Sequence, residues 1–203
     1  MPVVIEGVRE LRSALNKLAP DIKQQMDKEI REALKPIIAD ARSKVPGSAP
    51  GGLFNWNDPG YERKPRVKGK KEAFPSYNQT IIRRGLTYSI GTSKIDNSGF
   101  VSLYTLLNKS RSGAIIETAG RAGFPNPRAK SNNPNAGEKF IGAMNGIGGL
   151  VDYAGRGKNS TGRLLYAAYR RNQGKAVNAT LFAIEKAKQT FYARIRASKG
   201  MAA

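Results

Sequence analysis

The sequence contains no cysteine and no histidine. Without thiols it can form no disulfide, no cysteine nucleophile and no zinc finger. Without imidazoles it lacks the usual general base of hydrolytic triads and the commonest ligand of transition metals. The residue types that remain allow carboxylate chemistry, a serine–lysine pair or no catalysis at all. We therefore expect no metal site and no cofactor.

Acidic residues are scarce, since 15 Asp and Glu face 35 Lys and Arg and leave a net charge of +20. The excess is uneven: residues 1–60 carry +1, residues 61–119 carry +7 and residues 120–203 carry +12. A domain that repels itself this strongly usually meets a negative partner, namely nucleic acid, an acidic protein surface or an anionic membrane. Charge alone does not choose among the three.

Long apolar runs are also missing, because no window approaches the ~18 uninterrupted apolar residues of a membrane helix. The first residues already mix acids and bases by residue 12, so we expect no secretory signal. A chain of 203 residues has the size of one domain. We expect a single structural domain over residues 1–203, made in a cytoplasm-like compartment or packaged from one into a particle.

The clearest pattern is helical and covers residues 8–45. Apolar side chains recur there in steps of three and four, which is the spacing of an amphipathic helix. A shorter helix is expected over residues 8–18 and a longer one from Pro20, a residue that suits a first turn. Pro36 lies inside the longer pattern and is expected to kink that helix or split it in two. The apolar positions of the longer helix are Ile22, Met26, Ile30, Ala33, Leu34, Ile37, Ile38, Ala41 and Val45.

Two segments lack any helical or strand period. The first is a Pro- and Gly-rich loop or arm at 46–78, and the second is a Gly-, Pro- and Asn-rich insertion at about 120–162. The arm has two interpretations, a phosphate-tracking arm or a solvated loop that becomes ordered only against another subunit. The candidate DNA- or partner-contacting cations are Arg63, Lys64, Arg66, Lys68, Lys70 and Lys71 in the arm, with Arg170 and Arg171 near the carboxyl end.

The remaining segments predict an α+β fold. Runs of β-branched and aromatic residues indicate strands at 80–84, 87–92, 99–107 and 114–117, which would form a small antiparallel sheet of three or four strands. Helical spacing returns at 162–172 and 177–198. The expected architecture is a long kinked N-terminal helix packed on this sheet, with a C-terminal helix and long extended loops.

The carboxylates do not form a convincing catalytic pair. Asp58 and Glu62 are four apart, but they lie in the Pro- and Gly-rich arm. The acids of the long helix alternate with Lys and Arg, as on a solvent-facing surface crossed by ion pairs. We expect no enzymatic activity. The helix acids are Asp27, Glu29, Glu32 and Asp40.

Three short motifs carry a resemblance to a known family. Lys35-Pro36 is followed by Ala41-Arg42 and then Pro46, and a later Ile116-Glu117 is followed by Gly120. In this order the chain resembles the tail-completion (neck) proteins of siphovirus-type phages, the family that includes the minor tail protein Z of phage lambda. The resemblance covers roughly residues 10–125. The basic loop at 46–78 is longer than the family pattern, and residues 126–176 have no clear counterpart in it.

The resemblance implies a structural virion protein that forms a ring, expected to be a hexamer, in the phage neck. Its partners would be copies of itself, the tail terminator or tail tube and the head connector, with non-specific contact to genomic double-stranded DNA and no membrane. It would be assembled in the host cytoplasm and reside in the virion. The alternatives are a tail terminator or head-closure ring protein, or a non-viral cytoplasmic nucleic-acid-binding protein.

Overall fold

The computed structural model describes residues 7–51, 56, 75–91, 103–121, 136–152 and 161–200. It divides the chain into two compact units, and each is described by itself. Unit 1 comprises residues 1–36, 88–105 and 171–203, and unit 2 comprises residues 37–87 and 106–170. The expectation of one domain over residues 1–203 stays a prediction.

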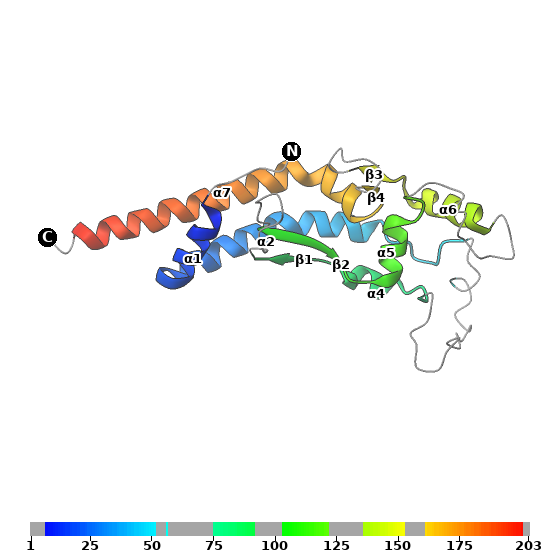
Figure 1. The fold of residues 1–203 in the computed structure, drawn as a ribbon, viewed down its shortest axis with the longest axis horizontal. Helices are drawn as coiled ribbons and strands as arrows, with labels where there is room; N and C mark the ends of the chain where they lie inside the picture. The colour runs from blue at the N-terminus through cyan, green and yellow to red at the C-terminus, as the bar shows by residue number, and fades with distance from the viewer. Residues whose placement is uncertain are drawn as a thin grey trace, which may run out of the picture. The chain divides into compact units, whose positions relative to one another are not determined.

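The elements follow in the order shown in Figure 1. The helices are α1 (Val8–Leu18), α2 (Pro20–Ser43), α4 (Gln79–Gly85), α5 (Arg111–Thr118), α6 (Ala136–Ile147) and α7 (Leu165–Gly200). The strands are β1 (Leu86–Ile90), β2 (Tyr104–Asn108), β3 (Val151–Asp152) and β4 (Thr161–Gly162).

The α+β class is confirmed, but the strands are arranged differently from the prediction. In the described part of the chain, β1 pairs with β2 and β3 pairs with β4, giving two two-stranded sheets in place of one larger sheet. The β3–β4 pair is antiparallel, with Val151 opposite Gly162. The predicted strands at 80–84 and 114–117 are wrong, because these residues lie in helices α4 and α5. Part of the predicted insertion at 120–162 is helix α6.

In unit 1, α2 and α7 run side by side (Figure 1). Two ion pairs connect them, Asp21 with Arg194 and Glu29 with Lys186, so the helices are antiparallel. The small side chains of Ala183 and Ala187 on α7 are buried, which allows close helix packing. The other buried apolar side chains of this core are Leu15, Ala19, Ile22, Met26, Ile30, Leu34, Ala176, Ile184 and Phe191.

The N-terminal helices form as predicted, although α2 is not split at Pro36. It runs without interruption for 24 residues from Pro20 to Ser43. Pro36 is exposed, so its ring meets solvent and not the core. Asp27, expected on the solvent face, is instead 6% exposed and pairs with Arg12 of α1. That ion pair joins α1 to α2 within unit 1.

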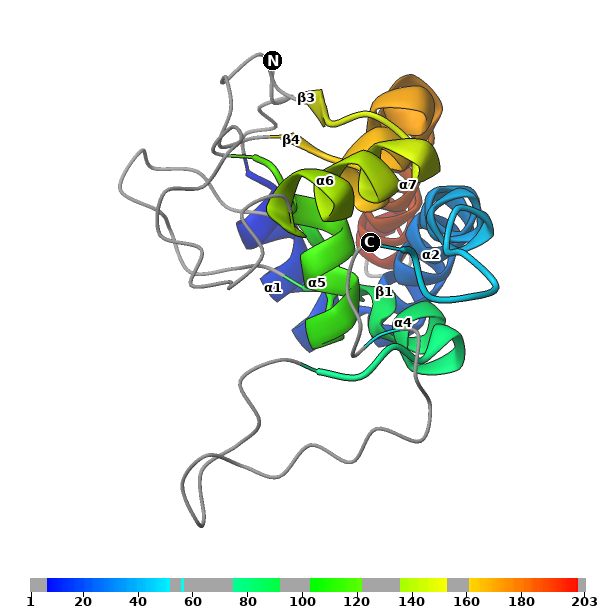
Figure 2. The ribbon, with the colours of Figure 1, turned by 90° about the vertical axis from the view of Figure 1, so that its right-hand side faces the viewer.

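In unit 2, helices α5 and α6 lie near β4 and the beginning of α7 (Figure 2). The buried core joins the end of α2 to the helices that follow it. Trp56, from the predicted arm, is 4% exposed and donates to the carbonyl of Pro75 at 2.8 Å. Its ring also meets Phe140 of α6 edge-on at 5.6 Å. The arm at 46–78 is therefore anchored at Trp56 in the chain's own core.

Candidate functional site

The basic residues singled out from the sequence lie mostly outside the described part of the chain. This applies to Arg63, Lys64, Arg66, Lys68, Lys70 and Lys71. Arg170 and Arg171 lie on exposed positions of α7. The guanidinium of Arg170 donates to the carbonyl of Asp152 in β3, and Arg171 also has a partner within the chain. Neither arginine is therefore a free cation.

The strongest charged cluster of unit 2 centres on Glu117, near the end of α5. This residue is 3% exposed, and its carboxylate accepts three backbone N–H groups, from Leu164 at 3.1 Å, Leu165 at 2.9 Å and Tyr166 at 3.1 Å. Helix α7 begins at Leu165. The first N–H groups of a helix have no partner within it and carry partial positive charge. Glu117 therefore caps α7 from a helix that lies more than 40 residues earlier in the chain.

Arg163 makes the complementary contacts at the other helix end. Its guanidinium donates to the carbonyls of Ile116 at 3.3 Å and Ala119 at 2.5 Å, and to the side-chain oxygen of Asn145 at 2.6 Å. Those carbonyls belong to the negative end of α5, where a cation is favourable. Glu117 thus caps the start of α7, and Arg163 caps the end of α5. We call these two residues the Glu117–Arg163 clamp.

Two glycines make the clamp sterically possible. A Cβ at Gly162 would lie 2.1 Å from a carboxylate oxygen of Glu117, a distance that no side chain tolerates. Gly120 has φ +78 and lies directly after α5, the left-handed position that favours glycine at a helix end. Ile116 is fully buried. The motif residues Ile116, Glu117 and Gly120 therefore stabilise the fold of unit 2.

Burial raises the pKa of Glu117, while its three backbone hydrogen bonds and Arg121 act in the opposite direction. Burial lowers the pKa of Arg163, and the charge of Glu117 opposes that shift. Both carboxylate oxygens of Glu117 already accept hydrogen bonds from backbone N–H groups of the chain itself. The arrangement suits a structural capping group better than a catalytic acid.

The second resemblance motif also supports the fold of unit 2. Arg42 donates to the carbonyl of Arg83 at 2.9 Å and to that of Leu86 at 2.9 Å, which satisfies the end of α4. Ala41 is fully buried, and the carbonyl of Pro46 accepts the Tyr77 hydroxyl. Each motif residue that the structure describes in this region therefore contacts the chain itself.

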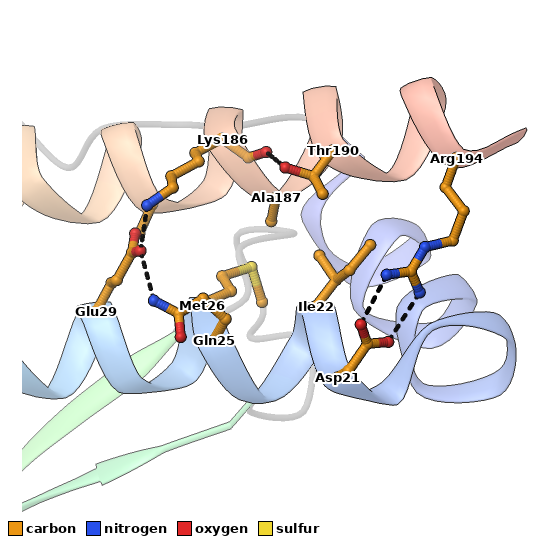
Figure 3. Close-up of a pocket in the computed structure, with 10 residues that line it drawn as sticks. Asp21, Ile22, Gln25, Met26, Glu29, Lys186, Ala187, Thr190 and Arg194 are labelled. Carbon is orange, nitrogen blue, oxygen red and sulfur yellow. Dashed lines mark hydrogen bonds and ion pairs between the residues drawn. The ribbon is translucent and has the colours of Figure 1, made fainter. Parts of the chain in front are cut away.

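A shallow groove of about 200 Å³ lies between α2 and α7 in unit 1 (Figure 3). Its floor contains Ile22, Met26 and Ala187, and an ion pair crosses it at each end. The Arg194 hydrogen bond lowers the pKa of Asp21 to about 2, and Lys186 lowers that of Glu29.

The two groove carboxylates do not form a catalytic pair. Asp21 and Glu29 are eight residues apart on α2, which is about 12 Å along the axis. Paired carboxylates that cleave one bond lie roughly 5–9.5 Å apart. Both carboxylates also form ion pairs with cations of α7, so the groove is part of the packing contact between the two helices.

Sequence reasoning missed the most exposed aromatic side chain of the described residues. Phe182 of α7 is 68% exposed, and Tyr192 on the same helix is 51% exposed. Apolar residues with helical spacing on this helix, such as Leu181 and Ile184, form one stripe along it. Phe182 lies off that stripe, and an apolar residue outside the helical period is the signal in the sequence that could have revealed it.

Comparisons with known proteins give no relatives: no family model, no curated protein and no solved structure matches the chain. In the described residues, no helix is long and apolar enough to cross a membrane. No group of three or more acidic side chains in the same residues is placed to hold a metal ion.

Proposed function

We propose that the chain is a structural subunit of a phage neck, where it completes the tail and joins it to the head connector. The resemblance of Lys35-Pro36, Ala41-Arg42 and Ile116-Glu117 to the tail-completion family is the basis of the proposal. The observation that supports it most is the exposure of two aromatic side chains on α7, Phe182 at 68% and Tyr192 at 51%. Aromatic side chains are enriched among the residues that anchor protein–protein interfaces.

The charged residues of the described structure fit this role. Glu117, Arg163, Arg42 and Asp27 each bind backbone or side-chain groups of the chain itself. These contacts hold helices of the chain together. The excess of cations in the second half of the chain suits either acidic neighbouring subunits or the passage of double-stranded DNA.

The net charge of +20 favours one other candidate, a non-viral nucleic-acid-binding protein. Such a protein would bind DNA or RNA as a free subunit. Its affinity would fall steeply with salt, because each phosphate contact releases a condensed counterion.

Light scattering on the purified chain separates the two roles. For the neck protein we expect a ring, of about 130 kDa if six subunits of 22.0 kDa assemble, or a monomer that stays free of DNA at physiological salt. A monomer that binds a double-stranded DNA fragment tightly and releases it as salt rises would instead support the nucleic-acid-binding protein.

A further inference from the structure

The outward side of α7 in unit 1 carries a regular stripe of exposed residues. Lys175, Phe182, Gln189 and Arg196 recur every seven residues, and all four are exposed. A seven-residue repeat keeps side chains on one side of a helix, as in coiled-coil seams. Tyr192 lies beside the stripe, three residues after Gln189. We call these five residues the α7 stripe.

The opposite side of the same helix is already occupied. Ala176, Ala183 and Ala187 are buried at the spacing of a second seam, together with Thr180. Helix α7 thus has one seam that packs within unit 1 and another seam that is exposed.

Cations without acidic partners lie at the two ends of the α7 stripe. Lys186 and Arg194 are paired with α2, and Lys188 is paired with Glu185. Among the described residues, no acidic side chain pairs with Lys175, Arg196 or Lys199. Residues 171–200 contain seven Lys and Arg but only one acid. The uncompensated charge at the ends of the stripe, at Lys175 before Phe182 and at Arg196 after Tyr192, is therefore positive.

We propose that the α7 stripe docks an acidic amphipathic helix of a partner protein, with Phe182 as the central apolar anchor. The stripe has the length and spacing for a helix-to-helix seam, and its cations complement carboxylates on both sides of an apolar partner face. Aromatic anchors of this kind contribute most of the affinity in protein interfaces. This inference rests on the proposed structural role and specifies the chemistry of one partner.

Two other occupants fit the stripe less well. A second copy of this chain would bring another net charge of +20 to a cationic surface. A single-stranded nucleic acid would stack adjacent bases on neighbouring rings, but Phe182 and Tyr192 are ten residues apart, about 15 Å along the helix.

The test uses the full chain and a synthetic 21-residue helical peptide, with leucine and alanine on one face and glutamate on the flanks. Titration followed by fluorescence anisotropy is expected to show saturable binding. Phe182→Ala should weaken that binding at least tenfold, and Arg196→Gln should weaken it severalfold. The matched controls are Leu18→Ala, which removes a side chain 69% exposed on α1, and Arg31→Gln on α2, and both should bind as the wild type does.

Three results would overturn the proposal. The first is no peptide binding by the wild type, or equal binding by Phe182→Ala and Leu18→Ala. The second is tighter binding of a 20-residue oligothymidylate or a DNA duplex that is lost in Phe182→Ala, which would assign the stripe to nucleic acid. The third is self-association that Phe182→Ala abolishes. A ring that forms normally while peptide binding fails would reject the docking proposal and leave the neck assignment standing.

Discussion

Replacement of Glu117 by glutamine is expected to lower the free energy of unfolding by about 3 kcal/mol at pH 7. The wild-type carboxylate accepts N–H groups from Leu164, Leu165 and Tyr166. Either orientation of a glutamine amide places its own NH₂ group against one of these donors. The substitution also removes the negative charge that faces the buried guanidinium of Arg163, which would then lack its counter-charge.

Urea denaturation measures this effect without changing the ionic strength. Glu32→Gln is the matched control, because Glu32 is exposed and pairs only with Lys35 on the same helix, among the contacts that the structure describes. That control should change the free energy of unfolding by less than about 0.5 kcal/mol. If Glu117→Gln costs less than about 1 kcal/mol, the carboxyl group does not cap α7 as an anion, and the role assigned to the clamp is wrong.

Replacement of Asp27 by alanine is the second large effect, expected in unit 1. Asp27 is 6% exposed and binds the guanidinium of Arg12 through both oxygens, at 2.6 and 3.3 Å. Lys23 adds a third contact at 2.9 Å. Removal of the carboxylate leaves a buried arginine with its charge uncompensated, so we expect a loss of about 3–5 kcal/mol in unfolding free energy.

The double variant Arg12→Met with Asp27→Leu shows whether the loss of unfolding free energy comes from the uncompensated charge of Arg12. It removes both charges and keeps apolar volume at the α1–α2 contact. Since such replacements of buried pairs are often close to neutral, the double variant should be clearly more stable than Asp27→Ala. Equal destabilisation of the two would mean that packing, and not the ion pair, holds α1 against α2.

The sequence predicted helices best where the apolar period was long. The stripe from Ile22 to Val45 corresponds to α2, since many positions with the same spacing outweigh one proline. The short β-branched runs at 80–84 and 114–117 were assigned to strands from composition, and they form helices. Local capping explains the difference: Asn78 accepts the N–H of Ile81, and Ser110 accepts that of Gly113. These caps were visible in the sequence three residues before each bonded N–H group.

Tertiary pairing could not be predicted in the same way. Asp27 looked like one more acid on a solvent-facing helix, because its partner Arg12 lies on another helix. Glu117 was recognised only as part of a motif, since the N–H groups that it caps are more than 40 residues away. The gap expected between the two C-terminal helices is also absent. Helix α7 continues through Gly174, where the cost of about 1 kcal/mol is small beside the packing of the buried seam that follows it.

The neck assignment predicts that the genome encoding this chain produces phage particles. The most direct test is electron microscopy of these particles, labelled with gold-conjugated antibodies against the chain. We expect gold at the junction of head and tail. We also expect particles made without the chain to separate into heads and unjoined tails. Label on the capsid shell or the tail tip, or intact joined particles without the chain, would contradict the neck assignment.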